Sequence, residues 1–330
     1  MRRMRAALWP LVVLLGTAPA IGATPAGAQD FPTRPIQIVV PWPPGAIDIY
    51  IRLLKAPMEQ DLGQAVIVET KPGANGYIGT QAVAEAKPDG YTLLANTSSS
   101  IVMGPLTSRN ARFQVQRDFA PISNIYDSQF VLVVRKSLPV KSLAELIAYA
   151  KQNPGKLNYG SPGIGSTLHL ISLNFSRVAG LEMTHVPYRG FAPLMQDLLG
   201  GTLDMAFVAA GTIRPMILSG GVTPLAVDHG AVPAGLGQLG QVSDALPSFE
   251  TIPTFIGLWA PTGTPKPVIG RLNRAVLAAL ANDQVRRTMI EQGNIPAGGS
   301  PEAFAAEIDR NLAISARLVD AAKAAGAKFE

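Results

Sequence analysis

Three short loops of this sequence concentrate groups that can bind an anion: hydroxyl side chains, glycines and free backbone N–H groups. Each loop follows an apolar, strand-like run and precedes a run with helical periodicity. Helix N-termini carry unpaired N–H groups and a partial positive charge, so they suit carboxylates. Ser and Thr hydroxyls add further donors. The candidate ligand-binding residues are Pro44, Gly45 and Ala46 in the first loop, Ser98 and Ser99 in the second, and Ser161, Gly165, Ser166 and Thr167 in the third.

Each loop also has a purely structural interpretation. Ser166 or Thr167 could only cap the helix that follows it. Asp48 falls in the first turn of a helix, where a carboxylate is favoured by the helix dipole; we prefer this role, although it could also meet an ammonium or hydroxyl group of a ligand. His169 lies one position off an apolar stripe, so we expect it to brace its loop. Because three such loops occur in one chain, we favour a shared anion site.

The sequence offers little for catalysis. It contains no G-x-S-x-G, Walker A or H-E-x-x-H motif. Gly163-Ile164-Gly165 begins like a dinucleotide-binding fingerprint, but Leu168 occupies the third glycine position. With no cysteine and only three scattered histidines, we expect no metal and no cofactor. Hydrogen bonds to a charged group contribute about 1.5–3 kcal/mol each, and micromolar affinity needs about 8 kcal/mol. A few such bonds suffice for micromolar affinity, so we favour a protein that binds its ligand without catalysis. A secreted hydrolase using a cleft serine is the alternative.

The elements that must position these loops alternate along the chain. Runs rich in Val, Ile and Leu predict strands at 36–41, 66–69, 91–95, 130–134, 157–160, 184–186, 204–208, 223–227 and 255–260. Apolar residues at steps of three and four predict helices at 47–62, 76–87, 142–151, 166–180, 192–199, 267–280, 283–292 and 301–325. The alternation is typical of an α/β fold with parallel sheets covered on both faces. Ligands gather at the carboxyl ends of such strands.

The N-terminal segment predicts export. Arg2, Arg3 and Arg5 precede an apolar run, and Ala26-Gly27-Ala28 forms a cleavage pattern, so residues 1–28 are interpreted as a signal peptide cleaved after Ala28. Its removal takes away three arginines and no acid, so the formal charge of +5 falls to +2. Nothing indicates a nucleic-acid surface. The absence of cysteine suits a bacterial periplasm better than a small disulfide-rich extracellular module.

A series of motifs runs in order from Phe31 to the end of the chain. They include Val40-Pro41-Trp42-Pro43-Pro44-Gly45, Pro72-Gly73-Ala74-Asn75-Gly76, Lys87-Pro88-Asp89-Gly90-Tyr91, Gly163-x-Gly165-Ser166-x-x-His169-Leu170, His185-Val186-Pro187-Tyr188-Arg189-Gly190 and Asp197-Leu198-Leu199-Gly200-Gly201. In these motifs the sequence resembles the Bug-type periplasmic solute-binding receptors of tripartite tricarboxylate transporters. Each motif is short, but their order and coverage of the mature chain make the resemblance specific.

The resemblance implies an α/β, two-lobed periplasmic-binding-protein (Venus flytrap) fold, each lobe a mainly parallel sheet flanked by helices. Residues 29–129 and 256–330 would form domain I and residues 130–255 domain II. The implied function is capture of a small organic anion, a mono- or dicarboxylate, in the cleft and its delivery to the membrane permease of such a transporter. Tyr188, Gly190 and Ala209 join the expected ligand contacts. We expect a periplasmic monomer that is not an enzyme.

Two departures from the family pattern bear on the ligand. The family usually has a second glycine where this chain has Ala46, and Asp48 comes one residue early. Ala46 disfavours positive φ, so the first loop could grip a ligand differently. At Val208-Ala209-Ala210 this chain is apolar, whereas many members of the family have a polar residue there. We infer a ligand with one carboxylate end and a less polar far end.

Overall fold

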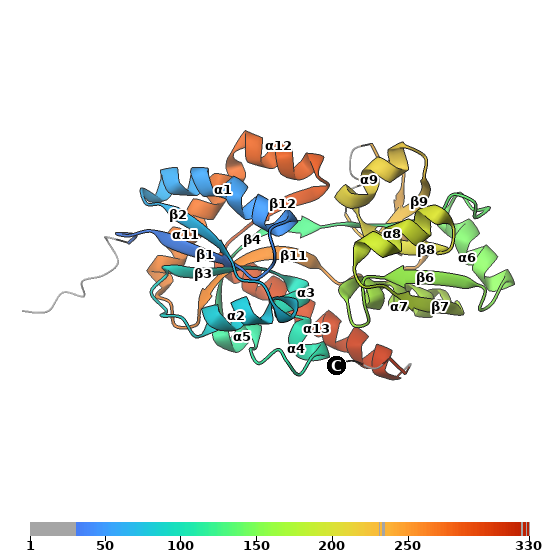
Figure 1. The fold of residues 1–330 in the computed structure, drawn as a ribbon, viewed down its shortest axis with the longest axis horizontal. Helices are drawn as coiled ribbons and strands as arrows, with labels where there is room; N and C mark the ends of the chain where they lie inside the picture. Colours follow the sequence, from blue (N-terminus) through green and yellow to red (C-terminus); the bar gives the residue numbers. More distant parts are fainter. Residues whose placement is uncertain (1–30, 231, 233–234, 325, 328, 330) are drawn as a thin grey trace, which may run out of the picture.

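The chain forms two α/β lobes joined side by side, as the computed structural model shows for residues 31–230, 232, 235–324, 326–327 and 329 (Figure 1). The predicted signal peptide lies outside these described residues. Each lobe contains one six-stranded sheet covered by helices on both faces. The two-lobed α/β prediction is therefore confirmed.

The first lobe is built on a sheet with strand order β12-β4-β11-β3-β1-β2. Its strands are β1 (Ile36–Val40), β2 (Val66–Thr70), β3 (Thr92–Thr97), β4 (Phe119–Ser128), β11 (Thr254–Pro261) and β12 (Asn294–Gly298). The helical elements that follow them are α1 (Ala46–Leu62), the 3₁₀ turn η1 (Ala74–Gly76), α2 (Tyr77–Ala84), α3 (Ser98–Ile101), α4 (Gly104–Thr107), α5 (Val115–Asp118), α11 (Lys266–Ala281), α12 (Asp283–Glu291) and α13 (Pro301–Ala324).

The second lobe is built on a sheet with strand order β10-β9-β5-β8-β6-β7. Its strands are β5 (Phe130–Arg135), β6 (Leu157–Ser161), β7 (Met183–Pro187), β8 (Met205–Ala209), β9 (Val222–Val227) and β10 (Gly240–Gln241). Its helices are α6 (Leu143–Gln152), α7 (Thr167–Ala179), α8 (Phe191–Gly200), α9 (Ala210–Leu218) and α10 (Val242–Ala245).

Both sheets are mixed: most strands of each sheet run in the same direction, as predicted, and β11, β12 and β5 run opposite to the other strands of their sheets. In the first sheet β1 pairs in parallel with β2 and β3, whereas β11 with β3, β11 with β4, and β12 with β4 are antiparallel. In the second sheet β5 is antiparallel to both of its neighbours. The antiparallel pairs involve β4, β5 and β11, the strands through which the chain passes between the lobes.

Strand periodicity builds a core on each face of each sheet. In β1, Ile36, Ile38 and Val40 face a core with α1 and α11, whereas Val39 faces a second core with Trp259 of β11. The same alternation divides β5 between two cores of the second lobe. Side chains of successive strand residues point to opposite faces, so one short apolar run contributes to two cores. The loops at the strand ends are thereby fixed in position.

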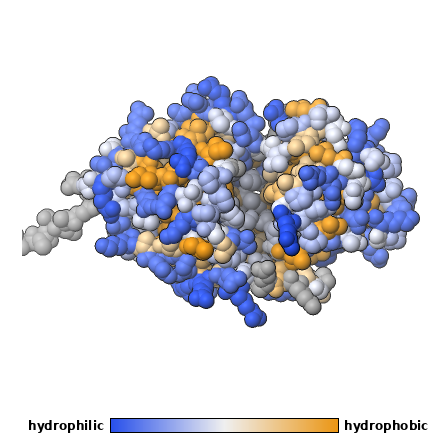
Figure 2. Space-filling view, viewed as in Figure 1, coloured by the Kyte–Doolittle hydropathy of each residue, from blue (hydrophilic) through white to orange (hydrophobic). Residues whose placement is uncertain are grey.

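The lobes are connected at several places. β4 ends at Ser128 and β5 begins at Phe130, and the chain returns at Thr254, where β11 begins. Helix α13 also spans the junction, since Phe304 belongs to a first-lobe core and Leu318 to a second-lobe core. The domain boundaries themselves remain a prediction. A furrow separates the lobes on the face shown in Figure 2, with hydrophobic residues beside it on the second lobe.

Candidate functional site

A cavity of about 460 Å³ lies between the two lobes. Its lining contains hydroxyl-bearing and apolar residues and no charged side chain. Trp42, Ile47, Thr97, Ser99, Ser128 and Thr254 come from the first lobe, and Phe130, Pro162, Ser166, Thr167, Leu168, Phe191 and Ala209 from the second. The loops that the sequence analysis singled out therefore meet at one cavity.

The first-lobe wall includes the start of α1. Gly45 is the N-cap, with φ 173° and ψ −154°, and no side chain caps this helix end. The carbonyl of Gly45 accepts from Ile49, so the N–H groups of the first turn have no helical acceptor. Pro44 and Gly45 are exposed beside the cavity, whose lining takes Trp42 and Ile47 from this loop. Ala46 is the first residue of α1.

Asp48 has a local partner. Its two carboxylate oxygens each accept from Nε of Arg52 at 2.9 Å, one helical turn away. Asp48 is buried, whereas the Arg52 side chain is half exposed. The acidic residue thus satisfies the favoured structural role, in the first turn of α1 where the dipole stabilises it.

The two serines of the second loop have different roles. Ser98 is buried; its hydroxyl donates to the carbonyl of Pro253 and accepts from the N–H of Phe255. It therefore ties α3 to β11, where the chain returns from the second lobe. Ser99 lines the cavity, and its Oγ lies 2.8 Å from Oγ1 of Thr167. That hydrogen bond crosses from one lobe to the other.

The second-lobe wall is the start of α7. Ser166 is its N-cap: Oγ accepts from the N–H of His169 and donates to the carbonyl of Gly163. Thr167, the first residue of α7, is buried and meets Ser99. α7 is thirteen residues long and apolar on one face, so packing fixes the direction of its N-terminus toward the cavity.

Ser161 and two histidines lie behind this wall. The hydroxyl of Ser161 is fully buried, 2.8 Å from Nε2 of His185, and also contacts the carbonyl of Gly163. The His185 ring stacks on His169 with a centroid distance of 4.0 Å. Nδ1 of His169 accepts from the N–H of Gly165, so this histidine braces its loop as expected.

The environment of the two histidines keeps them neutral. Burial lowers the pKa of His169 to about 4, and burial together with the neighbouring His169 lowers the pKa of His185 to about 4. A serine–histidine pair suggests a nucleophile, but Ser161 has no exposed surface. A nucleophile must reach its substrate. The pair therefore positions the 161–166 loop.

A second cavity of about 590 Å³ adjoins the first at Pro162. Tyr188 lines it, and its hydroxyl donates to Oδ2 of Asp197 at 2.7 Å. Arg189 and the hydroxyl-bearing Thr107 and Ser108 line it as well. Gly190, the N-cap of α8, precedes Phe191 of the main cavity. The 187–190 turn thus separates two parts of the interlobe space.

Four of the residues predicted to bind ligand line the main cavity: Ser99, Ser166, Thr167 and Ala209. Pro44, Gly45, Ala46, Gly165 and Gly190 flank the lining residues in sequence, whereas Asp48, Ser98, Ser161 and Tyr188 have the structural partners given above. Sequence reasoning missed Ser128, Phe130 and Thr254, which line the cavity at the lobe crossings. Only the apolar runs that begin at Phe130 and Phe255 could have pointed to them.

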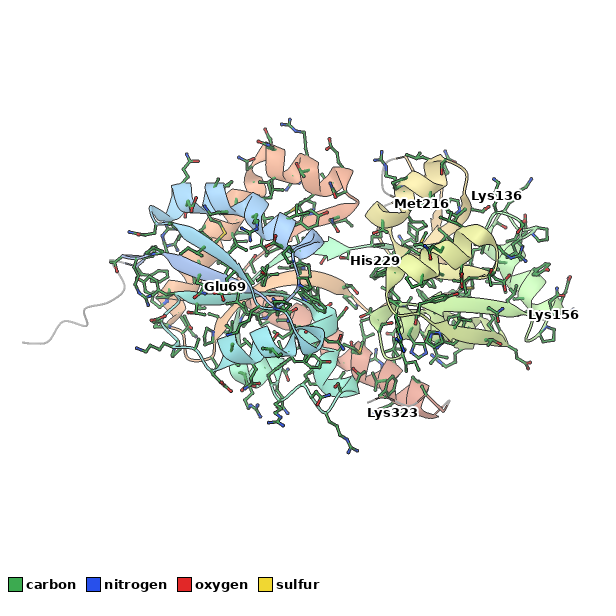
Figure 3. All side chains as sticks on the ribbon, viewed as in Figure 1. Glu69, Lys136, Lys156, Met216, His229 and Lys323 are labelled. Atoms are coloured by element: carbon green, nitrogen blue, oxygen red, sulfur yellow. The ribbon has the colours of Figure 1, made fainter. Side chains whose placement is uncertain are left out.

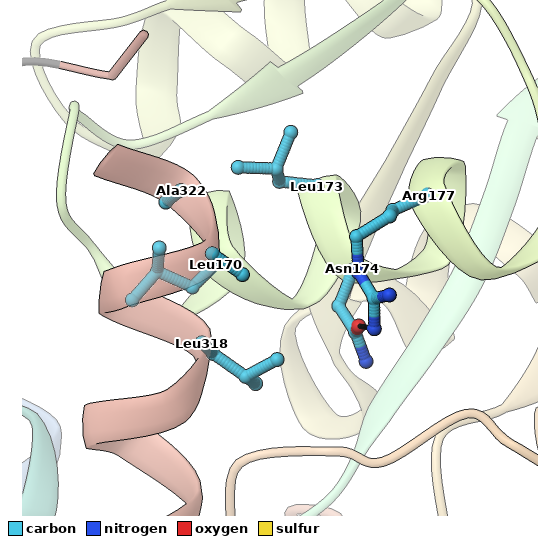
Figure 4. Close-up of a pocket in the computed structure, with 7 residues that line it drawn as sticks. Leu170, Leu173, Asn174, Arg177, Leu318 and Ala322 are labelled. Carbon is cyan, nitrogen blue, oxygen red and sulfur yellow. Dashed lines mark hydrogen bonds between the residues drawn. The ribbon is translucent and has the colours of Figure 1, made fainter. Parts of the chain in front are cut away.

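Two other observations bear on the chemistry. Within the part of the chain that the structure describes, no three His, Asp or Glu residues are grouped to hold a metal ion. A separate cavity of about 50 Å³ lies between α7 and α13, where Arg177 donates to Asn174 (Figure 4). It is small and lined mostly by Leu and Ala, so the interlobe cavity is the better ligand site.

No helix among the described residues is both long and apolar enough to cross a bilayer.

A family profile described as "Tripartite tricarboxylate transporter family receptor" matches residues 50–323. A "UPF0065 protein in tcbD-tcbE intergenic region" of Pseudomonas sp. (strain P51) is 36% identical over 299 residues, covering 89% of this chain and 88% of the relative. Protein BugT of Bordetella pertussis (strain Tohama I / ATCC BAA-589 / NCTC 13251) is 34% identical over 289 residues, covering 85% and 86%. The structure "R. palustris Rpa4515 with adipate" has a TM-score of 0.75 at 34% identity, covering 90% of this chain and 99% of that one.

Proposed function

The chain belongs to the Bug-type family of tripartite tricarboxylate transporter receptors, and on that premise we propose that it captures a small organic carboxylate between its lobes and delivers it to a membrane permease. The family is one of solute-binding receptors rather than enzymes. We propose that this chain, too, performs no chemistry on its ligand and that it acts in the periplasm after removal of residues 1–28.

One observation carries this proposal: α1 and α7 begin at the same cavity from opposite lobes. Each helix start has unpaired N–H groups and a partial positive charge. Hydroxyls of Ser99, Ser166 and Thr167 lie beside them. The lining holds no acid, and the nearby carboxylate of Asp48 is paired with Arg52. A ligand that touches both helix starts stabilises the closed arrangement of the lobes, which is how such a receptor senses it.

The rest of the lining favours a carboxylate with an aliphatic body. Trp42, Phe130, Phe191 and Ala209 offer apolar surface in the same cavity. Burying a methylene contributes about 0.8 kcal/mol, so a short hydrocarbon chain adds affinity there. The related structure that contains adipate is consistent with this class. We therefore propose a mono- or dicarboxylate with a short aliphatic chain.

The test begins with the purified mature protein. Mass spectrometry after denaturation identifies any co-purified ligand, and refolded, ligand-free protein is then screened by thermal shift against mono- and dicarboxylates, including adipate. We expect a subset to raise the melting temperature, because ligand binding stabilises the folded state by RT ln(1 + [L]/Kd). A folded, ligand-free sample that responds to no carboxylate would contradict the proposal.

A further inference from the structure

The two lobes also touch where α9 begins and α12 ends. Gly211, the second residue of α9, lies against the carbonyl of Gln292, which follows α12. A Cβ added to Gly211 would lie 1.6 Å from that carbonyl oxygen, and one added to Gly293 would lie 2.4 Å from the Gly211 nitrogen. Ordinary carbon contacts are about 3.5–4.0 Å. Only glycines allow these two backbones to approach so closely.

Both sides of this contact are anchored. In the first lobe the hydroxyl of Tyr50 accepts from Asn294 at 2.6 Å, and the ring of Tyr50 packs edge-on against Tyr126 at 4.8 Å. In the second lobe the N–H of Ala210 donates to the carbonyl of Gln129, at the crossing between β4 and β5. These bonds hold the two backbones in place near the contact. The start of α9 is therefore linked directly to a crossing strand.

The arrangement is electrostatically favourable as well. The C-terminus of α12 carries a partial negative charge and the N-terminus of α9 a partial positive charge. The two ends meet beside Ala209, which lines the ligand cavity. The contact between Gly211 and Gln292 therefore limits how closely the second-lobe residues of the cavity can approach its first-lobe residues.

We propose that Gly211 and Gly293 form a closing contact that sets how far the lobes close and so restricts the cavity to short ligands; the ligand part of this inference rests on the proposed function. The clash that a side chain would cause exists only when the lobes meet. Gly211 has no positive φ, and helical positions favour Ala over Gly by about 0.5–1 kcal/mol. Gly211→Ala should therefore leave the stability of the second lobe unharmed while it holds the lobes apart.

The test measures the distance between the lobes. The sequence has no cysteine, so Ser219→Cys at the end of α9 and Gln284→Cys in α12 give two exposed sites for spin labels. Electron–electron double resonance then compares the parent with Gly211→Ala and Gly211→Leu. Gly200→Ala is the matched control, because Gly200 ends a helix and nothing lies within 4 Å of its added Cβ.

We expect Gly211→Ala to lengthen the label distance by at least about 2 Å, the retreat needed to restore normal contact, and Gly211→Leu to lengthen it further. Gly200→Ala should leave it unchanged. Unchanged distances in both Gly211 variants overturn the closing contact. This readout needs no ligand, so it stands even if no carboxylate binds.

The ligand-size part has its own readout. If the parent binds adipate, isothermal titration measures its affinity for adipate and for the longer dicarboxylate sebacate. The ratio of these two affinities, which expresses the preference for adipate, should fall at least about tenfold in Gly211→Leu. A preference that stays the same in an opened variant overturns the claim that the closing contact sets ligand size.

Discussion

At the scale of single residues, the hydroxyl pair Ser99–Thr167 is the smallest unit that depends on both lobes. Its oxygens are 2.8 Å apart, and both residues line the cavity. A hydroxyl pair placed beside a helix N-terminus can bridge the lobes and also turn a donor toward a bound carboxylate. The pair is therefore placed to favour both closure and binding.

Thr167→Val tests this pair with a change of almost constant shape. We expect about a ten- to hundredfold loss of carboxylate affinity, because one hydrogen bond to a charged group contributes about 1.5–3 kcal/mol and about 1.4 kcal/mol is a factor of ten. Titration calorimetry of Thr167→Val, Ser99→Ala and the double variant gives the coupling between the two hydroxyls. Ser219→Ala, at an exposed site on α9's C-terminal side, is the control. Losses that simply add in the double variant would show that the pair does not act as a unit.

At the scale of elements, the loops were predictable because they follow a general rule. A strand that ends in a Gly- or Ser-rich loop before a helix places that loop at the ligand edge of its sheet, and this rule located Ser99, Ser166 and Thr167. β4 and β12 were missed because they contain Pro121 and Pro296, and because β4 pairs with β11 and β12 pairs with β4 across long sequence separations. Helix α9 was missed because it follows β8 directly and includes Pro215. No local pattern reveals such pairings.

The same limit applies to the cavity. Ser128, Phe130 and Thr254 line it because two crossing segments run side by side, and their partners are far away in sequence. Pattern reasoning identifies which segment could hold an anion. It cannot identify which apolar residues will face that segment from the other lobe.

The N-cap of α7 gives a prediction at this scale. Ser166→Ala removes the hydroxyl that accepts from His169 and donates to Gly163. Loss of a cap costs about 1 kcal/mol, so we expect the melting temperature to fall by about 2–4 °C and carboxylate affinity to weaken as the loop loosens. Calorimetry measures both effects.

Ser142→Ala is the matched control for that prediction. Ser142 caps α6 in the same way, accepting from the N–H of Glu145, and it does not line the cavity. It should lower the melting temperature by a similar amount and leave affinity unchanged. Equal loss of affinity in both variants would mean that the cap of α7 matters only for folding.

At the scale of the whole molecule, ionisable groups gather where the lobes join. Asn124 of β4 donates to Asp127 at 2.7 Å and to both carboxylate oxygens of Glu307 on α13 at 3.1 Å. His229 of the second lobe lies between the lobes, with Nδ1 3.0 Å from Asp228 (Figure 3). Burial opposes protonation of His229, but Asp228 and Asp127 raise its pKa nonetheless. Three carboxylates, Asp127, Asp228 and Glu307, thus share the junction with His229.

Glu307 makes the stability of the whole molecule depend on pH. Burial, and then the nearby Asp127, raises the pKa of Glu307 from 4.5 to about 7, against the opposing effects of Asn124 and Arg310. The fold therefore favours the protonated carboxyl group. The contribution of this carboxyl group to the free energy of unfolding is fully present below pH 4.5 and is lost as the pH rises through about 7.

Glu307→Gln replaces the protonated carboxyl group by a neutral amide of the same shape. Because each pKa unit corresponds to about 1.4 kcal/mol and partial exposure reduces the effect, we expect the variant to be about 2 kcal/mol more stable than the parent at pH 8. The two should be nearly equal at pH 4.5, since the parent is then protonated. Urea unfolding across this pH range measures the difference, with the exposed Glu302→Gln on the same helix as control. A stability difference that does not change with pH would show that Glu307 is ionised normally and that the junction does not resist its charge.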